Sequence, residues 1–261
     1  MNRQRPRSGW LGRLQHDESG MALTEFALFM IPTLFLGLAG LETVNFVIAN
    51  VRIGQIAMAT ADNAARVRDT IDEHDINEMF IGAKLAGQGI HFADQGRIIL
   101  SSIEPRTVAP LTTTVGGKEV PNQWIRWQRC YGMKNVASAY GAPRTAADAV
   151  ITDGSEAWKR SDPAQASAAP SDQVKSVPMM GATASPTGIG PNANRIAALT
   201  GTAVLFVEVV YDYKPIFWSS LIGERTIRDT IAFNVRQRAD QVLRPGGLAA
   251  TSWSTCSRRY V

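Results

Sequence analysis

The sequence predicts an α+β protein in which a long N-terminal helix packs on a small antiparallel β-sheet. The apolar run 26–41 carries no charge, and apolar residues at helical spacing continue from it to about residue 70. Four later segments have the alternation or the β-branched composition of strands. These segments are 97–104, 122–130, 203–213 and 224–236. Their mostly short connections favour antiparallel pairing, with the helix covering one face.

Composition describes a globular chain of one or two domains. The 261 residues are 45% hydrophobic and 19% charged, with a formal net charge of +4. So small a charge excess gives little support for a nucleic-acid partner. Two cysteines and three histidines are too few for a multi-cysteine zinc site or a histidine-rich metal centre. We therefore expect no metal and no cofactor.

The N-terminal segment has the composition of a membrane anchor. Residues 1–20 are polar and rich in arginine, whereas the 21 residues from Met21 to Leu41 carry one charge, on Glu25. A helix of that length spans roughly 30 Å, the thickness of a bilayer core. The preceding arginines favour a cytoplasmic N-terminus. We therefore expect a cytoplasmic leader over 1–20, a transmembrane helix over 21–42 and an exported head over 43–261.

The junction between leader and helix reads Gly20-Met21-Ala22-Leu23-Thr24-Glu25-Phe26. A glycine ends the polar leader, and a glutamate is the fifth residue after it. This pattern resembles the cleavage motif of type IV prepilins. The resemblance implies that a membrane-embedded prepilin peptidase cuts between Gly20 and Met21. It also implies that Glu25 pairs with the new N-terminal amine of a neighbouring subunit during assembly, which would offset the desolvation of either charge alone.

Three separated stretches resemble the TadE-like minor pilins of tight-adherence (Flp-type IVb) pilus systems. They are Ser19 to Leu28 followed by Pro32, Trp127 to Cys130, and Val207 to Phe217, which ends in Tyr-Asp-Tyr-Lys-Pro-Ile-Phe. The resemblance implies a pilin-like fold and a minor pilin-like (pseudopilin) subunit for biogenesis or assembly of the pilus. Residues 131–200 match nothing in that family.

The same resemblance implies partners and a location. The partners are the prepilin peptidase, other pilin-like subunits and the pilus assembly platform in the inner membrane. The protein would be a single-pass protein of the inner (cytoplasmic) membrane with a periplasmic or extracellular head, or would be incorporated in the pilus. Glu25 and Phe26 would be the assembly and recognition residues.

Two other interpretations of the N-terminus stay open. The first is an uncleaved, membrane-anchored binding protein whose exported head recognises a partner and whose Glu25 lies among lipid headgroups. The second is a secreted protein with a Sec signal peptide, although the apolar run exceeds the usual 7–15 residues. The chain contains none of the common catalytic or nucleotide-binding motifs, so we expect that it is not an enzyme.

The remaining helical signals follow in chain order. Val44, Val47, Ile48 and Val51 have helical spacing, which extends one helix from about 21 to 70, with a kink expected at Pro32. Asp75 and Glu78 resemble a capping box for a short helix over 76–86, which would end at Gly87. Residues 192–199 are expected to form another short helix.

Alternation assigns faces to the predicted strands. In 122–130 it places Gln123, Ile125, Trp127 and Arg129 on one face. In 203–213 the face toward the core holds Leu205, Val207, Val209, Tyr211 and Tyr213. In 224–236 it holds Ile227, Asp229, Ile231, Phe233 and Val235. The sheet that these strands form is expected to pack on the long helix.

Three further features concern loops and polar groups. Segment 161–191 contains five prolines among small residues and is expected to be a mobile surface loop, or alternatively a partner-binding one. Cys130 and Cys256 would lie in an oxidising compartment, which favours a disulfide over free or intermolecularly paired thiols. The acidic cluster 72–75 is expected to be a solvated cap rather than a metal site.

Overall fold

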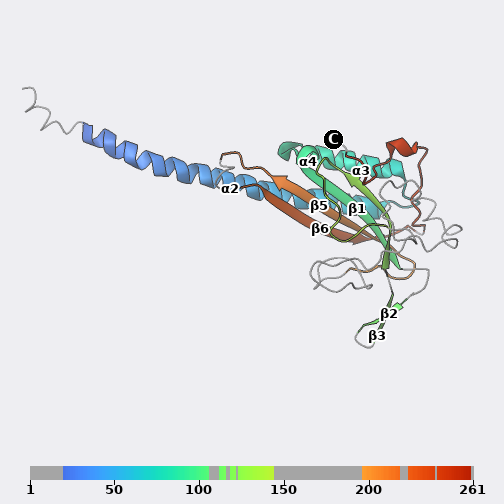
Figure 1. Ribbon diagram of the computed structural model, residues 1–261. Helices are drawn as coiled ribbons and strands as arrows, with labels where there is room; N and C mark the ends of the chain where they lie inside the picture. The colour runs from blue at the N-terminus through green and yellow to red at the C-terminus, as the bar shows by residue number, and fades with distance from the viewer. Residues whose placement is uncertain are drawn as a thin grey trace, which may run out of the picture.

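The computed structural model describes most of the chain and confirms the α+β class (Figure 1). It describes residues 20–105, 112–115, 118–121, 123–143, 196–217, 223–238 and 240–259. Residues 1–19 of the expected leader 1–20 and the expected loop 161–191 lie outside these residues. Residues 192–195 of the expected helix 192–199 also lie outside them. Residues 196–199 of that segment are described and are not helical.

One long helix dominates the molecule. Helix α2 (Met21–Arg66) continues through Pro32 without interruption, so the kink expected there stays a prediction. It ends at Arg66, before the expected residue 70, because the ψ of Val67 is 124°, which is outside the helical range. In Figure 1 its N-terminal half projects away from the sheet, while its C-terminal half lies beside β5 and β6.

The sheet has four antiparallel strands, as predicted. They are β1 (Gly96–Pro105), β4 (Gln123–Tyr131), β5 (Val204–Tyr213) and β6 (Arg225–Asn234), in the order β4-β1-β5-β6. A separate hairpin, which the sequence did not predict, consists of β2 (Thr112–Val115) and β3 (Lys118–Pro121). Helix α3 (Glu73–Ala86) leads through the short helices η2 (Gln88–Ile90) and α4 (Phe92–Gln95) into β1. The 3₁₀ turn η3 (Ala250–Ser252) lies near the C-terminus.

The main core lies between the helices and one face of the sheet. Its buried residues on α2 include Ile53, Ile56 and a run of alanines, which let the sheet approach the helix closely. The predicted inward faces of 203–213 and 224–236 are confirmed for their apolar members. Those packed in or against this core are Leu205, Val207, Val209, Tyr211, Tyr213, Ile227, Ile231, Phe233 and Val235. A smaller cluster around Phe206 and Tyr140 covers the opposite face.

A β-bulge corrects the predicted face of β4. Trp127 pairs with Ser102 and belongs to the main core, whereas Ile125 pairs with Ile103 and belongs to the opposite cluster. The register shifts between Ser102 and Ile103, so one extra residue is inserted on β4. Because a bulge adds a residue without a ladder partner, the strict alternation that placed Ile125 and Trp127 together fails here.

The start of α3 also differs from the prediction. Asp72, not Asp75, is the N-cap, and its carboxylate accepts a hydrogen bond from the backbone N–H of Asp75 at 2.8 Å. The Asp75 carboxylate in turn accepts the N–H of Asp72 at 3.1 Å, which completes a capping box. The helix therefore begins at Glu73, three residues earlier than expected. Asp72 and Asp75 are both acceptable caps by composition, and tertiary contacts around Arg244 decide between them.

Candidate functional site in the N-terminal helix

The N-terminal half of α2 exposes apolar side chains on every side. Leu23 and Leu36 are 73% and 75% exposed. The other large exposed apolar residues before Glu42 are Met21, Phe26, Leu28, Phe29, Met30, Ile31, Leu34, Phe35 and Leu41. A helix that is apolar all round needs an apolar environment. Among the described residues, α2 is the one helix long and apolar enough to cross a membrane.

The predicted cleavage bond coincides with the start of this helix. Gly20 is the N-cap and Met21 is the first helical residue. The φ of Gly20 is −81°, which any residue adopts, and a Cβ built on it meets no heavy atom within 4 Å. Within the described residues, the fold thus gives no steric reason for glycine at position 20.

The first turns of α2 hold the predicted assembly residues. Glu25 is exposed, and in the described part of the chain its carboxylate has no hydrogen-bond or ion-pair partner. Phe26 beside it is 67% exposed. A carboxylate in an otherwise apolar helix surface is costly to bury in a membrane unless a cation accompanies it. The arrangement therefore suits an intermolecular partner for Glu25.

A second acidic residue, which the sequence analysis missed, lies at the other end of the apolar segment. Glu42 is 1% exposed, and its carboxylate accepts a hydrogen bond from the hydroxyl of Tyr213. The same carboxylate accepts the backbone N–H groups of Ile216 at 3.0 Å and Phe217 at 3.1 Å. These contacts join the end of the apolar helix segment to the end of β5.

Burial and the contact with Glu42 change the pKa of the Tyr213 hydroxyl. Burial, followed by the hydrogen bond to the Glu42 carboxylate, raises the pKa of the Tyr213 hydroxyl well above its ordinary value. Tyr213 therefore stays a donor throughout the physiological range. The ring of Phe46 packs edge-on against Tyr213 with 5.2 Å between the centroids. Two sequence signals could have predicted the contact between Glu42 and Tyr213. One is an acidic residue directly after an apolar run, and the other is the stretch Tyr-Asp-Tyr-Lys-Pro.

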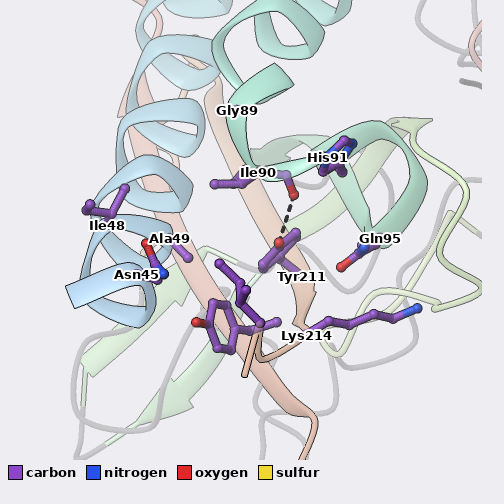
Figure 2. A pocket seen from close by; sticks show the side chains of 11 residues that line it. Asn45, Ile48, Ala49, Gly89, Ile90, His91, Gln95, Tyr211 and Lys214 are labelled. Atoms are coloured by element: carbon purple, nitrogen blue, oxygen red, sulfur yellow. Dashed lines mark hydrogen bonds between the residues drawn. The ribbon is translucent and has the colours of Figure 1, made fainter. Parts of the chain in front are cut away.

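A small pocket lies beside this junction, between α2 and the η2–α4 corner (Figure 2). Its volume is about 180 Å³, and the hydroxyl of Tyr211 in its lining donates a hydrogen bond to the carbonyl of Ile90 at 2.8 Å. His91 turns the chain here with a left-handed φ of 52°. The lining residues are Asn45, Ile48, Ala49, Gly89, Ile90, His91, Gln95, Tyr211, Tyr213, Lys214 and Ile216. This lining brings together no nucleophile and base in hydrogen-bond contact.

The C-terminal segment of the head is bonded to strands β4 and β1. Cys130 and Cys256 form a disulfide bond across a sequence separation of 126 residues. The backbone N–H of Cys130 donates to the carbonyl of Ser254 at 2.8 Å, and Arg97 donates to the carbonyl of Cys256 at 2.6 Å. The predicted disulfide is thus supported by hydrogen bonds from two neighbouring strands.

The acidic cluster 72–75 is not wholly solvated, contrary to expectation. Glu73 is 1% exposed, and both its carboxylate oxygens accept from Nε of buried Arg129, at 3.0 and 2.9 Å. The guanidinium of Arg129 also lies over the ring of Trp253, 5.8 Å from its centroid. The cluster was misassigned because Glu73 meets its partner only when α3 packs on β4, 56 residues away in sequence.

The described residues contain no group of three or more His, Cys, Asp or Glu side chains that could hold a metal ion. No protein-family model, curated protein or solved structure matches the chain. The features on which a function can be argued are therefore the helix start at Gly20, the exposed Glu25 and the junction at Glu42.

Proposed function

We propose that this chain is a TadE-like minor pilin (pseudopilin) subunit for biogenesis or assembly of a tight-adherence type IVb pilus. A prepilin peptidase would cut it between Gly20 and Met21. The mature helix would then enter a complex with other pilin-like subunits at the inner-membrane assembly platform. In this proposal the protein is a substrate of peptide-bond cleavage and has no catalytic role of its own.

The observation that carries the proposal is the position of Gly20 relative to α2. The glycine lies immediately before the first helical residue, and among the described residues neither its backbone angles nor its neighbours require the absence of a side chain. A requirement for glycine at this position would therefore come from another molecule. A peptidase whose active site accepts only the smallest residue before the scissile bond supplies such a requirement.

The chemistry of Glu25 supports the same proposal. Cleavage before Met21 creates an α-amine at the start of an apolar helix, where a charge is as costly as the Glu25 carboxylate. An ion pair between the amine of one subunit and Glu25 of its neighbour offsets both desolvation costs. It would also fix how far one helix slides along the other. Pairing between subunits gives Glu25 a partner that the described part of the single chain lacks.

We propose a single-pass location with the N-terminus in the cytoplasm and the head in the periplasm or outside the cell. The arginines of residues 1–20 favour this orientation. The disulfide between Cys130 and Cys256 is consistent with an oxidising compartment for the head.

The test is intact mass and N-terminal sequencing of the protein extracted from membranes of its native host, for the parent and for Gly20→Val. The parent should begin at Met21, and the variant should retain residues 1–20. Gly40→Val is the matched control, because Gly40 also has open space around a built Cβ within the same helix. It should be processed like the parent.

Two results would overturn the proposal. A parent chain that still carries residues 1–20 would favour an uncleaved membrane-anchored binding protein. A Gly20→Val chain of normal mature length would remove the role assigned to the glycine.

A further inference from the structure

The segment that follows β5 combines a fixed backbone with exposed apolar side chains. The N–H groups of Ile216 and Phe217 are bound by the Glu42 carboxylate, yet their side chains are 66% and 44% exposed. Most large apolar residues of the described head are buried in one of two clusters. Ile216 and Phe217 are therefore adjacent apolar side chains that do not pack in the core, and such exposed apolar residues often mark a contact with another molecule or a membrane.

The length of the apolar part of α2 determines where residues 214–217 lie relative to a membrane. The 21 residues from Met21 to Leu41 span roughly 30 Å, and Glu42 is the next residue. If 21–41 crosses a bilayer core, Glu42 lies at its boundary. Hydrogen bonds of 3.0 and 3.1 Å then place the backbone of Ile216 and Phe217 at the same boundary.

The surface around this segment has the composition of a membrane interface. Val44 and Val47 continue the exposed apolar surface of α2 past Glu42. Lys214 and Arg225 are exposed cations at the same end of the sheet, with Glu224 as an acidic neighbour. Figure 2 shows the Lys214 side chain extending away from the pocket residue Tyr211. Apolar side chains bordered by cations suit the zone where acyl chains meet phosphate groups.

We propose that residues 214–217 are a second membrane contact, in which Ile216 and Phe217 insert into the interface of the leaflet on which the head stands. The occupant of this surface is lipid, because the surface is continuous with the helix segment that spans the bilayer. The contact would hold the head in one orientation relative to the membrane. The inference rests on the proposed function only in requiring that α2 crosses a membrane.

Spin labelling of the full chain in phosphatidylcholine–phosphatidylglycerol vesicles tests the contact. A single cysteine is introduced at 217, 216, 199 or 36 and labelled, the native cysteines being joined in the disulfide. Oxygen dissolves in the bilayer, whereas a nickel chelate stays in water, so the ratio of their effects on the label reports depth. Leu199 is the matched control, because it is 75% exposed and precedes the opposite end of β5. Leu36, also 75% exposed, reports the spanning helix.

The expected oxygen-to-nickel ratio is severalfold higher at 216 and 217 than at 199, and highest at 36. A ratio at both 216 and 217 equal to that at 199, with Leu36 in lipid, would overturn the contact and leave the membrane anchor intact. Protection of both labels from both reagents would overturn it as well, since the segment would then be covered by protein. A water-exposed label at 36 would overturn the anchor and the contact together.

Discussion

The carboxylate of Glu42 and the hydroxyl of Tyr213 form a buried hydrogen bond across 171 residues of sequence. Glu42 ends the apolar half of α2, and Tyr213 ends β5. The same carboxylate holds the two backbone N–H groups that follow the strand. This side chain therefore joins the end of the exposed helix segment to the end of β5, in addition to the packing of the rest of α2 on β5 and β6.

Tyr213→Phe tests the strength of this connection. Removing the hydroxyl leaves a buried carboxylate with one donor fewer, so the free energy of unfolding should fall by about 1–3 kcal/mol. The measurement is urea denaturation of the full chain in detergent micelles. Tyr211→Phe is the matched control, because the Tyr211 hydroxyl donates to a neutral carbonyl on Ile90. A loss no larger than that of the control would contradict the role given to Glu42.

Glu25→Gln should separate processing from assembly. Within the described residues, the Glu25 carboxylate has no partner, so the folded head should keep the parental stability in urea. The variant should be cut after Gly20 like the parent, and incorporation into pili or subunit complexes should fall strongly. Quantitative immunoblots of sheared pili and membranes measure the two steps. Parental amounts of pili would exclude an ion pair at Glu25 as an assembly contact.

Glu73→Ala should be among the most destabilising substitutions in the head. It leaves the buried guanidinium of Arg129 without its carboxylate, and breaking a buried pair in this way typically costs about 3–5 kcal/mol. The double variant Glu73→Ala/Arg129→Met removes both charges and should recover part of the loss. Thermal unfolding of the three proteins measures both effects. If Glu73→Ala is as stable as the double variant, the loss of stability does not come from the unpaired charge of Arg129.

Glu208 should make stability depend on pH. Burial raises the pKa of its carboxyl above the ordinary value, although Ser138 and the N–H of Ala139 donate to it and Arg228 pairs with it. Protonation therefore favours the folded state. The stabilisation is complete below the pKa of the unfolded chain, about 4.3, and is lost as pH rises through the folded value.

Glu208→Gln does not titrate, so its free energy of unfolding should increase relative to that of the parent as pH rises from 4 to 7. Urea denaturation at several pH values measures the difference. Asp229→Asn is a control on the neighbouring strand, because Asp229 is only partly buried and its carboxylate accepts a local N–H from Thr230. A pH-independent difference for Glu208→Gln would contradict a raised pKa.

The sequence by itself determined the class of the fold and most of its elements. The uncharged run 26–41, the alternation in β5 and β6, the proline that ends β1 and the proline shortly after β5 are local patterns. The structure places helix and strands where these patterns predicted them. The inward face of β5 also followed from alternation, because a regular strand presents every second side chain to the same side. The two cysteines were correctly expected to pair.

Tertiary structure alone decided the features that depend on residues distant in sequence. The bulge on β4 moved Ile125 and Trp127 to different faces because β1 and β4 pair with a shifted register. Asp72 and not Asp75 is the N-cap of α3, because backbone hydrogen bonds join Ile71 and Glu73 to Arg244 at this point. Glu42 and Glu73 are polar in sequence, and only folding supplies the Tyr213 and Arg129 partners that allow their burial. Local patterns cannot predict such pairs, because the energy that permits them comes from contacts formed only in the folded chain.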